Sequence, residues 1–438
     1  MTKGLLGVSA VALLTSLVAF PQVQAAAAGD TLKVDVAPKV ELSGETNVVY
    51  YVFNGKKNTK DQNGGKGNGH HIDIQDARLN VEAIGIAELY GGLEYSALFG
   101  FVGDPQEGQT SVEETRIKLR GPWGFFIAGN TRGVDDRMSR GAFSVMGATG
   151  GFNGNYDRVV NMSTGVLGGI DMVGTQKDAN KLTYVTPRIM GVQFGASVTP
   201  DGRQKGYAKL RTIGNSDSSD KTFDKNNVSL GLNFNHKFAN GLGLTATATA
   251  VFGNAQIARR LEALAASAVA NRVAETFYSG ERKRSASYAL GLLLDYGAFD
   301  FGIEYVDNGK SQVHKAILGR NAGYALSGAI GYKFGVNRVA LGYQHTERKL
   351  GTAFKHFGVV DVISPDNPKA RLDVVSLTYD RTLAKGLGIF AEGNLMRSRT
   401  DSRWVSLQNS AKAVNSGLAD GVGKNNAGIV MTGLKVRW

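Results

Sequence analysis

The sequence predicts an all-β fold, a single transmembrane antiparallel β-barrel of sixteen strands, and three observations predict it. Apolar residues recur at every second position rather than with a helical period. Glycine supplies 58 of the 438 residues and proline only 8, which is too much glycine for a helical bundle. Hydrophobic residues make up 42% of the chain, yet after the N-terminus no apolar run reaches the ~18 residues that a membrane helix needs.

The first residues have the features of an export signal. Lys3 is followed by an almost unbroken apolar stretch over residues 5–20, which Pro21 ends. Small residues around Ala25 suit a signal peptidase, so we expect residues 1–25 to be a removed signal peptide. The formal net charge of +12 then falls to +11, because Lys3 is the one charged side chain removed. No Pro/Ser-rich linker divides the rest, and we expect residues 26–438 to form one domain.

The predicted strands have two chemically distinct faces. In the segment 227–238, Leu230 and Leu232 share one face, whereas Ser229 and Asn233 share the other. The polar face is rich in Gly, Ser, Thr, Asn and charges, as a water-filled lumen requires. The apolar face carries large aliphatic residues with aromatic residues toward the strand ends, which is typical of a lipid-facing surface. A soluble β-sandwich also alternates, so alternation by itself leaves both folds open.

The lengths of the connections favour the barrel. The strands are predicted at 39–53, 71–84, 89–101, 112–120, 124–131, 179–187, 192–200, 227–238, 243–253, 285–296, 299–307, 322–334, 338–348, 371–383, 387–400 and 426–438. Short turns alternate with connections that are mostly long. The short turns are 85–88, 121–123, 188–191, 239–242, 297–298, 335–337 and 384–386; the long connections include 54–70, 132–178, 201–226, 254–284 and 401–425. One tight rim and one elaborated rim are typical of a membrane barrel, and a sandwich has no reason to keep this order.

The last predicted strand supports the same conclusion. Val430, Leu434, Val436 and Trp438 lie on one face, and the chain ends at an aromatic residue. Closing the sheet leaves no edge strand, as the bilayer demands when every backbone group must be paired.

Several segments resemble motifs of the Gram-negative general porins, in the family's order. Residues 180–187, which end in Tyr-Val-Thr-Pro, followed by Gly191, resemble the family's "N-S-I-x-Y-x-S-P … G-F" motif. Residues 77–81 resemble its "A-R-L-G-F" strand, and residues 377–381 with 389–392 resemble a strand pair near its C-terminus. Val436 and Trp438 resemble the signal that is read by the outer-membrane assembly machinery.

The resemblance implies a homotrimeric channel in the bacterial outer membrane that passes small hydrophilic solutes and ions passively. It also implies that the third extracellular loop folds into the lumen; the matching connection is 132–178. The implied partners are further copies of the chain, outer-membrane lipid and lipopolysaccharide, and the assembly machinery. We expect no nucleic-acid partner.

We expect no enzyme activity, no cofactor and no metal site. Six histidines are scattered along the chain, and only His70 and His71 are adjacent. The sequence shows no nucleophile, base and orienting group that converge at one rim or face.

A constriction between a basic wall and an acidic loop is the predicted functional site. Charges act strongly at a narrow point because solutes lose part of their hydration there, and opposite charges on facing walls create a transverse field. The predicted wall cations are Arg78, Arg116, Lys118 and Arg120, and the predicted loop acids are Asp135 and Asp136. Arg78 matches the family's wall arginine, and the other three alternate with Ile117 and Leu119. In the alternative, these are solvated lumen charges, and Asp135 pairs locally with Arg137 and Arg140.

The net charge of +11 predicts a weak anion preference and low selectivity. In the alternative, rim cations such as Arg282, Lys283 and Arg284 bind anionic lipopolysaccharide and leave the lumen balanced.

Residues 257–277 depart from the two-residue period, and we expect a helix there that either caps the mouth or packs on the loops.

Three functions remain open from the sequence. The first is a general diffusion porin. The second is a solute-selective outer-membrane channel. The third is a non-transport barrel, a surface antigen or adhesin whose long loops bind partners.

Overall fold

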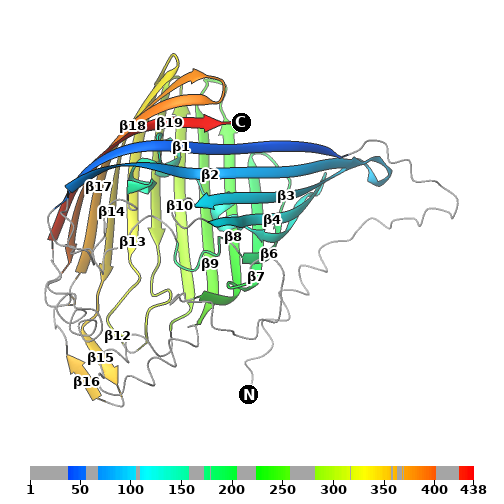
Figure 1. Ribbon diagram of the computed structural model, residues 1–438. Coiled ribbons are helices and arrows are strands. Elements are labelled where there is room, and N and C mark those ends of the chain that lie inside the picture. The colour runs from blue at the N-terminus through cyan, green and yellow to red at the C-terminus, as the bar shows by residue number, and fades with distance from the viewer. Residues whose placement is uncertain are drawn as a thin grey trace, which may run out of the picture.

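Sixteen strands form one closed barrel in which each strand pairs antiparallel with both neighbours (Figure 1). The computed structural model describes residues 38–55, 68–104, 109–156, 172–177, 179–204, 223–256, 282–315, 317–356, 359–362, 367, 369–400 and 424–438. The predicted signal peptide over 1–25 and the predicted helix over 257–277 lie outside the described residues. The predicted number of barrel strands and their order along the chain are confirmed.

The barrel strands lie close to their predicted positions. They are β1 (Lys39–Gly55), β2 (Asn68–Ala87), β3 (Leu93–Asp104), β4 (Gln109–Gly121), β5 (Gly124–Thr131), β6 (Ala179–Val185), β7 (Val192–Asp201), β8 (Phe223–Lys237), β9 (Gly243–Gln256), β10 (Ser285–Tyr296), β11 (Phe299–Asp307), β13 (Tyr324–Phe334), β14 (Asn337–Lys349), β17 (Lys369–Ala384), β18 (Leu387–Thr400) and β19 (Lys424–Arg437). No helix in the described part of the chain is long and apolar enough to cross a membrane.

The first turn differs from the prediction. Residues 85–88 were expected to connect two strands, but β2 continues to Ala87 and a short 3-10 helix, η1 (Glu88–Tyr90), follows. Gly91 and Gly92 then make the turn with φ of 69° and 73°, values that glycine adopts without strain. Gly85 is needed for a different reason, because a side chain there would meet the ring of Tyr95 on the paired strand.

A second sheet of three short strands lies where the sequence indicated only loops. It consists of β12 (Ile317–Leu318), β15 (Ala353–His356) and β16 (Val359–Val362). These segments are much shorter than the ~10 residues used to recognise a membrane strand, so the alternation gave no signal for them.

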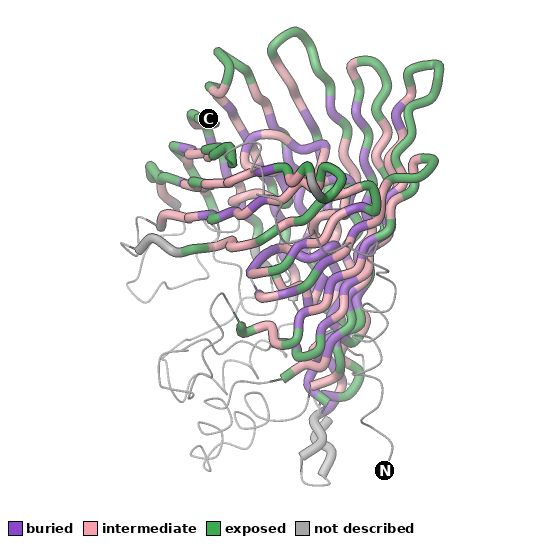
Figure 2. Tube along the Cα trace, turned by 90° about the vertical axis from the view of Figure 1, so that its right-hand side faces the viewer, coloured by how far each residue is buried: buried purple, intermediate pink, exposed green. Residues whose placement is uncertain are grey.

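The outward face of the barrel is apolar, as predicted. Leu290 is 50% exposed and Leu395 67% exposed although both are large aliphatic residues, and Figure 2 shows buried and exposed residues alternating along the strands.

The inward face is less uniformly polar than expected. A cluster of buried apolar side chains lies there, and it includes Val49, Leu372, Val374, Met396, Ile429 and Met431, together with Phe152 and Tyr156 of the third loop. The loop inside the barrel supplies the apolar partners for this part of the wall.

The barrel closes between β1 and β19. The backbone groups of Gly44 and Trp438 exchange two hydrogen bonds of 3.1 and 3.2 Å, and Arg437 pairs with Glu45 at 3.1 Å. Gly44 has no side chain, and a Cβ there would lie 2.6 Å from the Trp438 ring. Val436 and Trp438 are both exposed on the outward face. Their recognition by the assembly machinery stays a prediction.

We expect Trp438→Ala to weaken the seam between β1 and β19. The backbone hydrogen bonds can persist, but the indole that covers Gly44 is lost. Because Trp438 is 55% exposed, the expected loss in the free energy of unfolding is about 1–2 kcal/mol, below that of a fully buried Trp. Denaturant unfolding in detergent micelles measures it. Phe334→Ala removes an outward aromatic ring of β13 away from the seam, and an equal loss in that control would contradict the role of the seam.

Candidate functional site

The third long connection enters the barrel immediately after β5. Residues 132–156 lie along the inner face of the wall and contain three short helical turns, α2 (Val134–Arg137), η2 (Ala142–Val145) and η3 (Gly151–Asn153). The first contacts β7, β8 and β9; the second β10, β11 and β13; the third β14, β17 and β18. The predicted inward folding of the third loop is therefore confirmed for its described part, which runs along most of the wall opposite β2–β4 (Figure 1).

The loop lies over a row of inward-facing glycines. A Cβ at Gly231 would lie 2.8 Å from the Met138 sulfur, and one at Gly302 would lie 2.8 Å from the Cα of Ala142. A side chain at Gly291 would meet the carbonyl of Arg140. Because β8, β10 and β11 each have a glycine under the loop, the loop backbone lies closer to the wall at these three strands than a side chain would allow.

Wall hydroxyl groups bind the first half of the loop. Ser197 Oγ accepts a hydrogen bond from the backbone N–H of Val134 at 3.0 Å. The Thr247 hydroxyl accepts from the Arg140 N–H at 3.3 Å and donates to the Arg140 carbonyl at 2.9 Å. These contacts fix α2 and the turn after it against β7 and β9.

Wall charges bind the second half. Glu392 Oε2 accepts from the backbone N–H and the hydroxyl of Thr149, both at 2.9 Å, and Asp380 Oδ2 accepts from the N–H of Ala148 at 2.8 Å. Lys435 Nζ donates to the Ala148 carbonyl at 2.6 Å. Hydrogen bonds to charged groups contribute about 1.5–3 kcal/mol each, so these charges hold the loop backbone in place.

A buried lysine joins the two ends of the loop. The Lys181 ammonium donates to the carbonyl of Thr131, just before the loop, to that of Gln176, near the end of the loop, at 2.7 Å, and to that of Ala179, just after it, at 2.9 Å. Sequence reasoning assigned Lys181 no role because it reads as one more polar residue of β6. No sequence signal shows that three carbonyls surround it.

The predicted wall cations share the inner face of β2 and β4, but each ion pair that they form is with an acid of the same wall. Arg78 lies 3.6 Å from Glu113. Lys118 lies 3.5 Å from Glu94. Arg120 is exposed on the same face of β4 and makes no ion pair with any residue that the structure describes.

Arg116 is bound by two wall acids, and one of them also binds the loop. It lies 3.5 Å from Glu82 and 3.0 Å from Glu114. The Arg137 guanidinium of the loop also donates to Glu114, at 2.8 Å. At this contact the loop supplies the cation and the wall the acid, which is the reverse of the expected arrangement.

The predicted loop acids do not reach the wall cations. Asp136 pairs with Arg132 within the loop at 3.2 Å. Asp135 is 4% exposed and points toward Ser229 of β8. The local pairing considered as the alternative is thus present, but it joins Asp136 to Arg132 rather than Asp135 to Arg137 or Arg140.

Sequence reasoning missed Glu113 and Glu114. A register shift between β3 and β4 at Gly100 and Phe101 leaves Glu113 without a partner position, so the two adjacent acids contact different inward-facing arginines. The signal was present: two consecutive acids cannot both face the lumen in a regular strand, and a β-bulge resolves the conflict.

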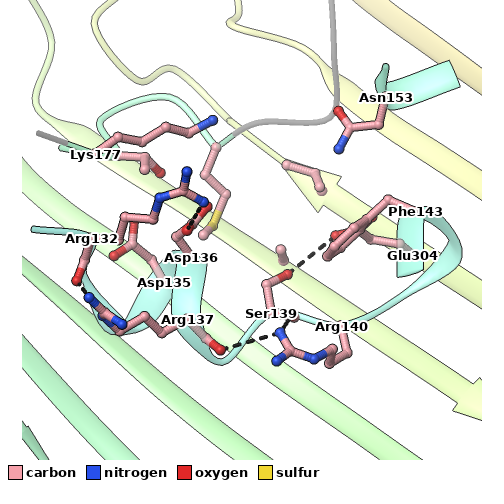
Figure 3. Close-up of a pocket in the computed structure, with 14 residues that line it drawn as sticks. Arg132, Asp135, Asp136, Arg137, Ser139, Arg140, Phe143, Asn153, Lys177 and Glu304 are labelled. Carbon is pink, nitrogen blue, oxygen red and sulfur yellow. Dashed lines mark hydrogen bonds and ion pairs between the residues drawn. The ribbon is translucent and has the colours of Figure 1, made fainter. Parts of the chain in front are cut away.

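Two cavities lie between the loop and the barrel wall. One of about 530 Å³ is bordered by Arg132, Asp135, Asp136, Arg137, Arg140, Lys177 and Glu304 together with Phe143 and Met172 (Figure 3). One of about 160 Å³ lies between loop and wall and is lined by Arg78, Asn80, Glu113, Glu114, Arg132 and Lys177. Together the linings hold five cations and five acids, of which Asp135 and Glu304 are almost fully buried. Within the described residues no group of His, Asp or Glu could hold a metal ion.

Burial shifts the pKa values of two loop residues. Burial raises the pKa of the Asp135 carboxyl above its ordinary value, although hydrogen bonds from Ser229 and Thr175 oppose the rise. Burial also lowers the pKa of the Arg137 guanidinium, and the adjacent Glu114 carboxylate opposes that fall. Because Asp135 and Glu304 are almost fully buried, fewer of the acids than of the cations that line the cavity are accessible.

A closed sixteen-stranded barrel with an apolar outside and a loop folded against its inner wall defines the class of transmembrane β-barrel channel proteins. The family model described as Gram-negative porin matches residues 11–401. The chain belongs to this family, and it is a protein of the bacterial outer membrane.

Individual similarities to known proteins are weaker. The chain is 26% identical over 240 residues to an uncharacterized protein of Rickettsia felis, and the match covers 49% of each chain. The chain thus spans about half the length of the curated relatives that it matches. An anion-selective porin from Comamonas acidovorans has a similar fold, with 16% identity, a TM-score of 0.54, and 92% of this chain and 100% of that chain covered. OmpT of Vibrio cholerae in its trimer form has 13% identity, a TM-score of 0.53 and the same coverage.

We expect Gly302→Val to displace the third loop from the wall. The new side chain would occupy the position of the Ala142 backbone, and overpacking of this kind costs about 1–3 kcal/mol. Trypsin should then cleave the folded, membrane-inserted variant after Arg137 or Arg140. The wild type should resist cleavage at these two sites. Gly393→Val is the matched control, because nothing lies within 4 Å of a Cβ at Gly393. Equal resistance of the Gly302 variant would contradict the close seating of the loop.

We expect Asp135 to make the loop more stable at acidic pH. Because its pKa is raised on folding, its contribution is fully present below the ordinary value of 3.8 and is lost as the pH rises through the raised value. Asp135→Asn should remove that part of the pH dependence, measured as the thermal unfolding midpoint in detergent across a pH series. Glu88→Gln, in the exposed first turn, serves as the control and should leave the profile unchanged. An identical profile for wild type and Asp135→Asn would show that Asp135 does not titrate on unfolding.

Proposed function

We propose that the chain forms a water-filled channel through which small hydrophilic solutes and ions diffuse passively, with low selectivity and a weak anion preference. Family membership and the barrel support the channel. The single observation that carries the low selectivity is the pairing of charges beside the loop: Arg78, Arg116 and Lys118 each have an acid of the wall within 3.6 Å. Paired charges project little net field onto a passing ion.

The anion preference rests on the loop. Asp135 and Glu304 are almost fully buried, while Arg140 is exposed and its guanidinium donates only to carbonyls of the loop, those of Arg137 and Ser139, among the described residues. A small accessible excess of positive charge remains beside the passage. Such an excess concentrates anions, and salt screens it.

We propose the predicted constriction in a modified form. Arg78, Arg116, Lys118 and Arg120 line the wall side, and the loop side is formed chiefly by Arg132, Arg137 and Arg140, with Asp136 neutralising Arg132. Asp135 acts as a buried support of the loop rather than as one side of a transverse field.

Export and assembly also remain proposals. We propose that residues 1–25 are cleaved as a signal peptide, that residues 26–438 form the mature domain, and that Val436 and Trp438 serve as the assembly signal. We propose a homotrimer, because the Vibrio cholerae OmpT with a similar fold is described in a trimer form.

Liposome swelling with sugars of graded size tests the channel against its alternatives. Uptake that falls smoothly with sugar size supports passive diffusion. Saturable uptake of one sugar would favour a solute-selective channel instead. The absence of any uptake by correctly folded protein would favour a non-transport surface barrel.

We expect Arg140→Gln to reduce the chloride-over-potassium permeability ratio. The change removes an exposed loop cation that pairs with no described acid, and the effect should be about twofold or less because water and salt screen the charge. Reversal potentials across a planar bilayer in a potassium chloride gradient measure the ratio. Lys385→Gln removes the same charge from an exposed turn at the short-turn rim, and it should leave the ratio unchanged. A strong cation preference of the wild type would overturn the proposed anion preference.

A further inference from the structure

An arginine near the end of β14 faces the lumen at the rim of the long connections. Arg348 has the same strand parity as Gly342, where a Cβ would lie 2.5 Å from the Phe152 ring of the third loop. Since residues of the same parity share one face of a strand, Arg348 faces inward as Gly342 does. Its partner on β17, Ala370, is only 2% exposed, which also places this pair on the inner wall.

The connection between β11 and β13 brings a second arginine, Arg320, beside the first. The Asn321 N–H donates to the Lys349 carbonyl at 3.3 Å, so Arg320 lies at the end of β14. A Cβ at Gly351 would lie 3.5 Å from the Cβ of Arg320. Within the same connection β12 pairs with β15, beyond the long-loop end of β13 and β14 (Figure 1). The Arg320 and Arg348 guanidinium groups are therefore close enough to repel each other.

A third arginine, Arg282, reaches the same place from the segment just before β10. Its backbone forms a bridge with His314 of the connection between β11 and β13, and its guanidinium donates to the Gln312 carbonyl at 3.2 Å. The Arg282 guanidinium also repels that of Arg320. We call Arg282, Arg320 and Arg348 the arginine cluster.

Acids do not neutralise Arg282 and Arg320 within the described part of the chain. Arg320 is half-buried and makes no hydrogen bond or ion pair with a described residue. Arg282 makes no ion pair there, and its Nε is buried without a hydrogen-bond partner. Burial, together with repulsion from Arg282, lowers the pKa of Arg320 to about 10, so Arg320 keeps its charge at neutral pH. Removing charges from water without a counter-ion is costly, and a bound anion would offset that cost.

The chemistry of the cluster indicates the class of anion. A guanidinium presents N–H donors in a planar fork that matches two oxygens of an oxyanion. Neighbouring guanidinium groups match an anion that has two charges and oxygens on several sides, which chloride does not have. Because Arg348 faces the lumen, the anion reaches the cluster from the water-filled side of the wall rather than from the lipid.

We propose that the arginine cluster binds a free divalent oxyanion, such as sulfate or hydrogen phosphate, at the mouth of the barrel. The cluster is separate from the cations of the third loop, because its members come from β14 and from the segments before β10 and β13. It lies at the rim of long connections, which in outer-membrane barrels is the extracellular one. The proposal rests on the proposed channel only for the route of the solute, and it adds a class of solute that the mouth concentrates.

Isothermal titration calorimetry of the full-length protein in detergent micelles free of lipopolysaccharide tests the proposal. The probe is sodium sulfate, titrated at constant ionic strength with sodium chloride as the balancing salt. We expect saturable binding to the wild type, and Arg320→Gln should weaken it at least about tenfold. Arg282→Gln is a second variant and should weaken it as well. Added lipid A, which carries phosphate groups on a lipid, should not displace the sulfate.

Lys349→Gln is the matched control. Lys349 is exposed beside Arg348 but has the opposite strand parity, so its removal takes away a neighbouring charge on the outer face. Sulfate affinity should change by about twofold or less, because water and salt screen this charge. The absence of saturable sulfate binding by the wild type, an equal loss in the control, or displacement of sulfate by lipid A overturns the proposal.

Planar-bilayer recordings separate this proposal from the proposed function. Sulfate should reduce the chloride current through the wild type in a saturable way, and Arg320→Gln should need at least about tenfold more sulfate for the same reduction. Sulfate binding by a folded protein that conducts no ions would contradict the channel alone. Ion conduction without sulfate binding would contradict the arginine cluster alone.

Discussion

Every strand of this barrel pairs on both sides because hydrocarbon offers no partner for a backbone N–H or C=O group. The seam between β1 and β19 follows from that constraint, and so does the strict alternation of side chains, since a paired strand presents one face to lipid and the other to the lumen. The outward face must then be apolar. The inward face does not have to be apolar, so its polar side chains and glycines can bind the third loop.

The loop has the same need for backbone partners but no sheet to join. Its N–H and C=O groups are bound by inward side chains of the wall: Ser197 and Thr247 at one end, Asp380, Glu392 and Lys435 at the other. Asp380 and Glu392 are inward-facing acids, but both accept hydrogen bonds from the loop backbone. Lumen selectivity depends on the charges that remain accessible, and the sequence total of +12 is a poor guide to it.

The barrel could be predicted from the sequence because the alternation of apolar and polar residues is visible within each segment of about ten residues. The lengths of the connections between these segments can be counted directly. The predictions that were wrong also concern short segments. Gly85 resembled a turn residue but makes room for Tyr95, and β12, β15 and β16 are too short to alternate visibly. The site could be predicted only in part. The inward parity of Arg116, and of Glu114 two residues before it, follows from their own strand. The pairing of Arg78 with Glu113 depends on a bulge, and the pairing of Arg137 with Glu114 depends on where a loop lies in three dimensions.

Inward and outward charges of the same strands then serve different purposes. Glu392 lies on the inner face of β18, where it binds the loop; Arg397 and Arg399 lie on the outer face, where neither forms an ion pair with a residue that the structure describes. An inward charge acquires a protein partner because the loop is there to be bound. An outward charge at the end of the apolar band can pair only with an outward residue of a neighbouring strand, as Glu347 does with Arg371, or face headgroups and water. Because a two-residue period separates the two sets completely, the chain can change its lipid contacts at this rim without changing the charges beside its passage.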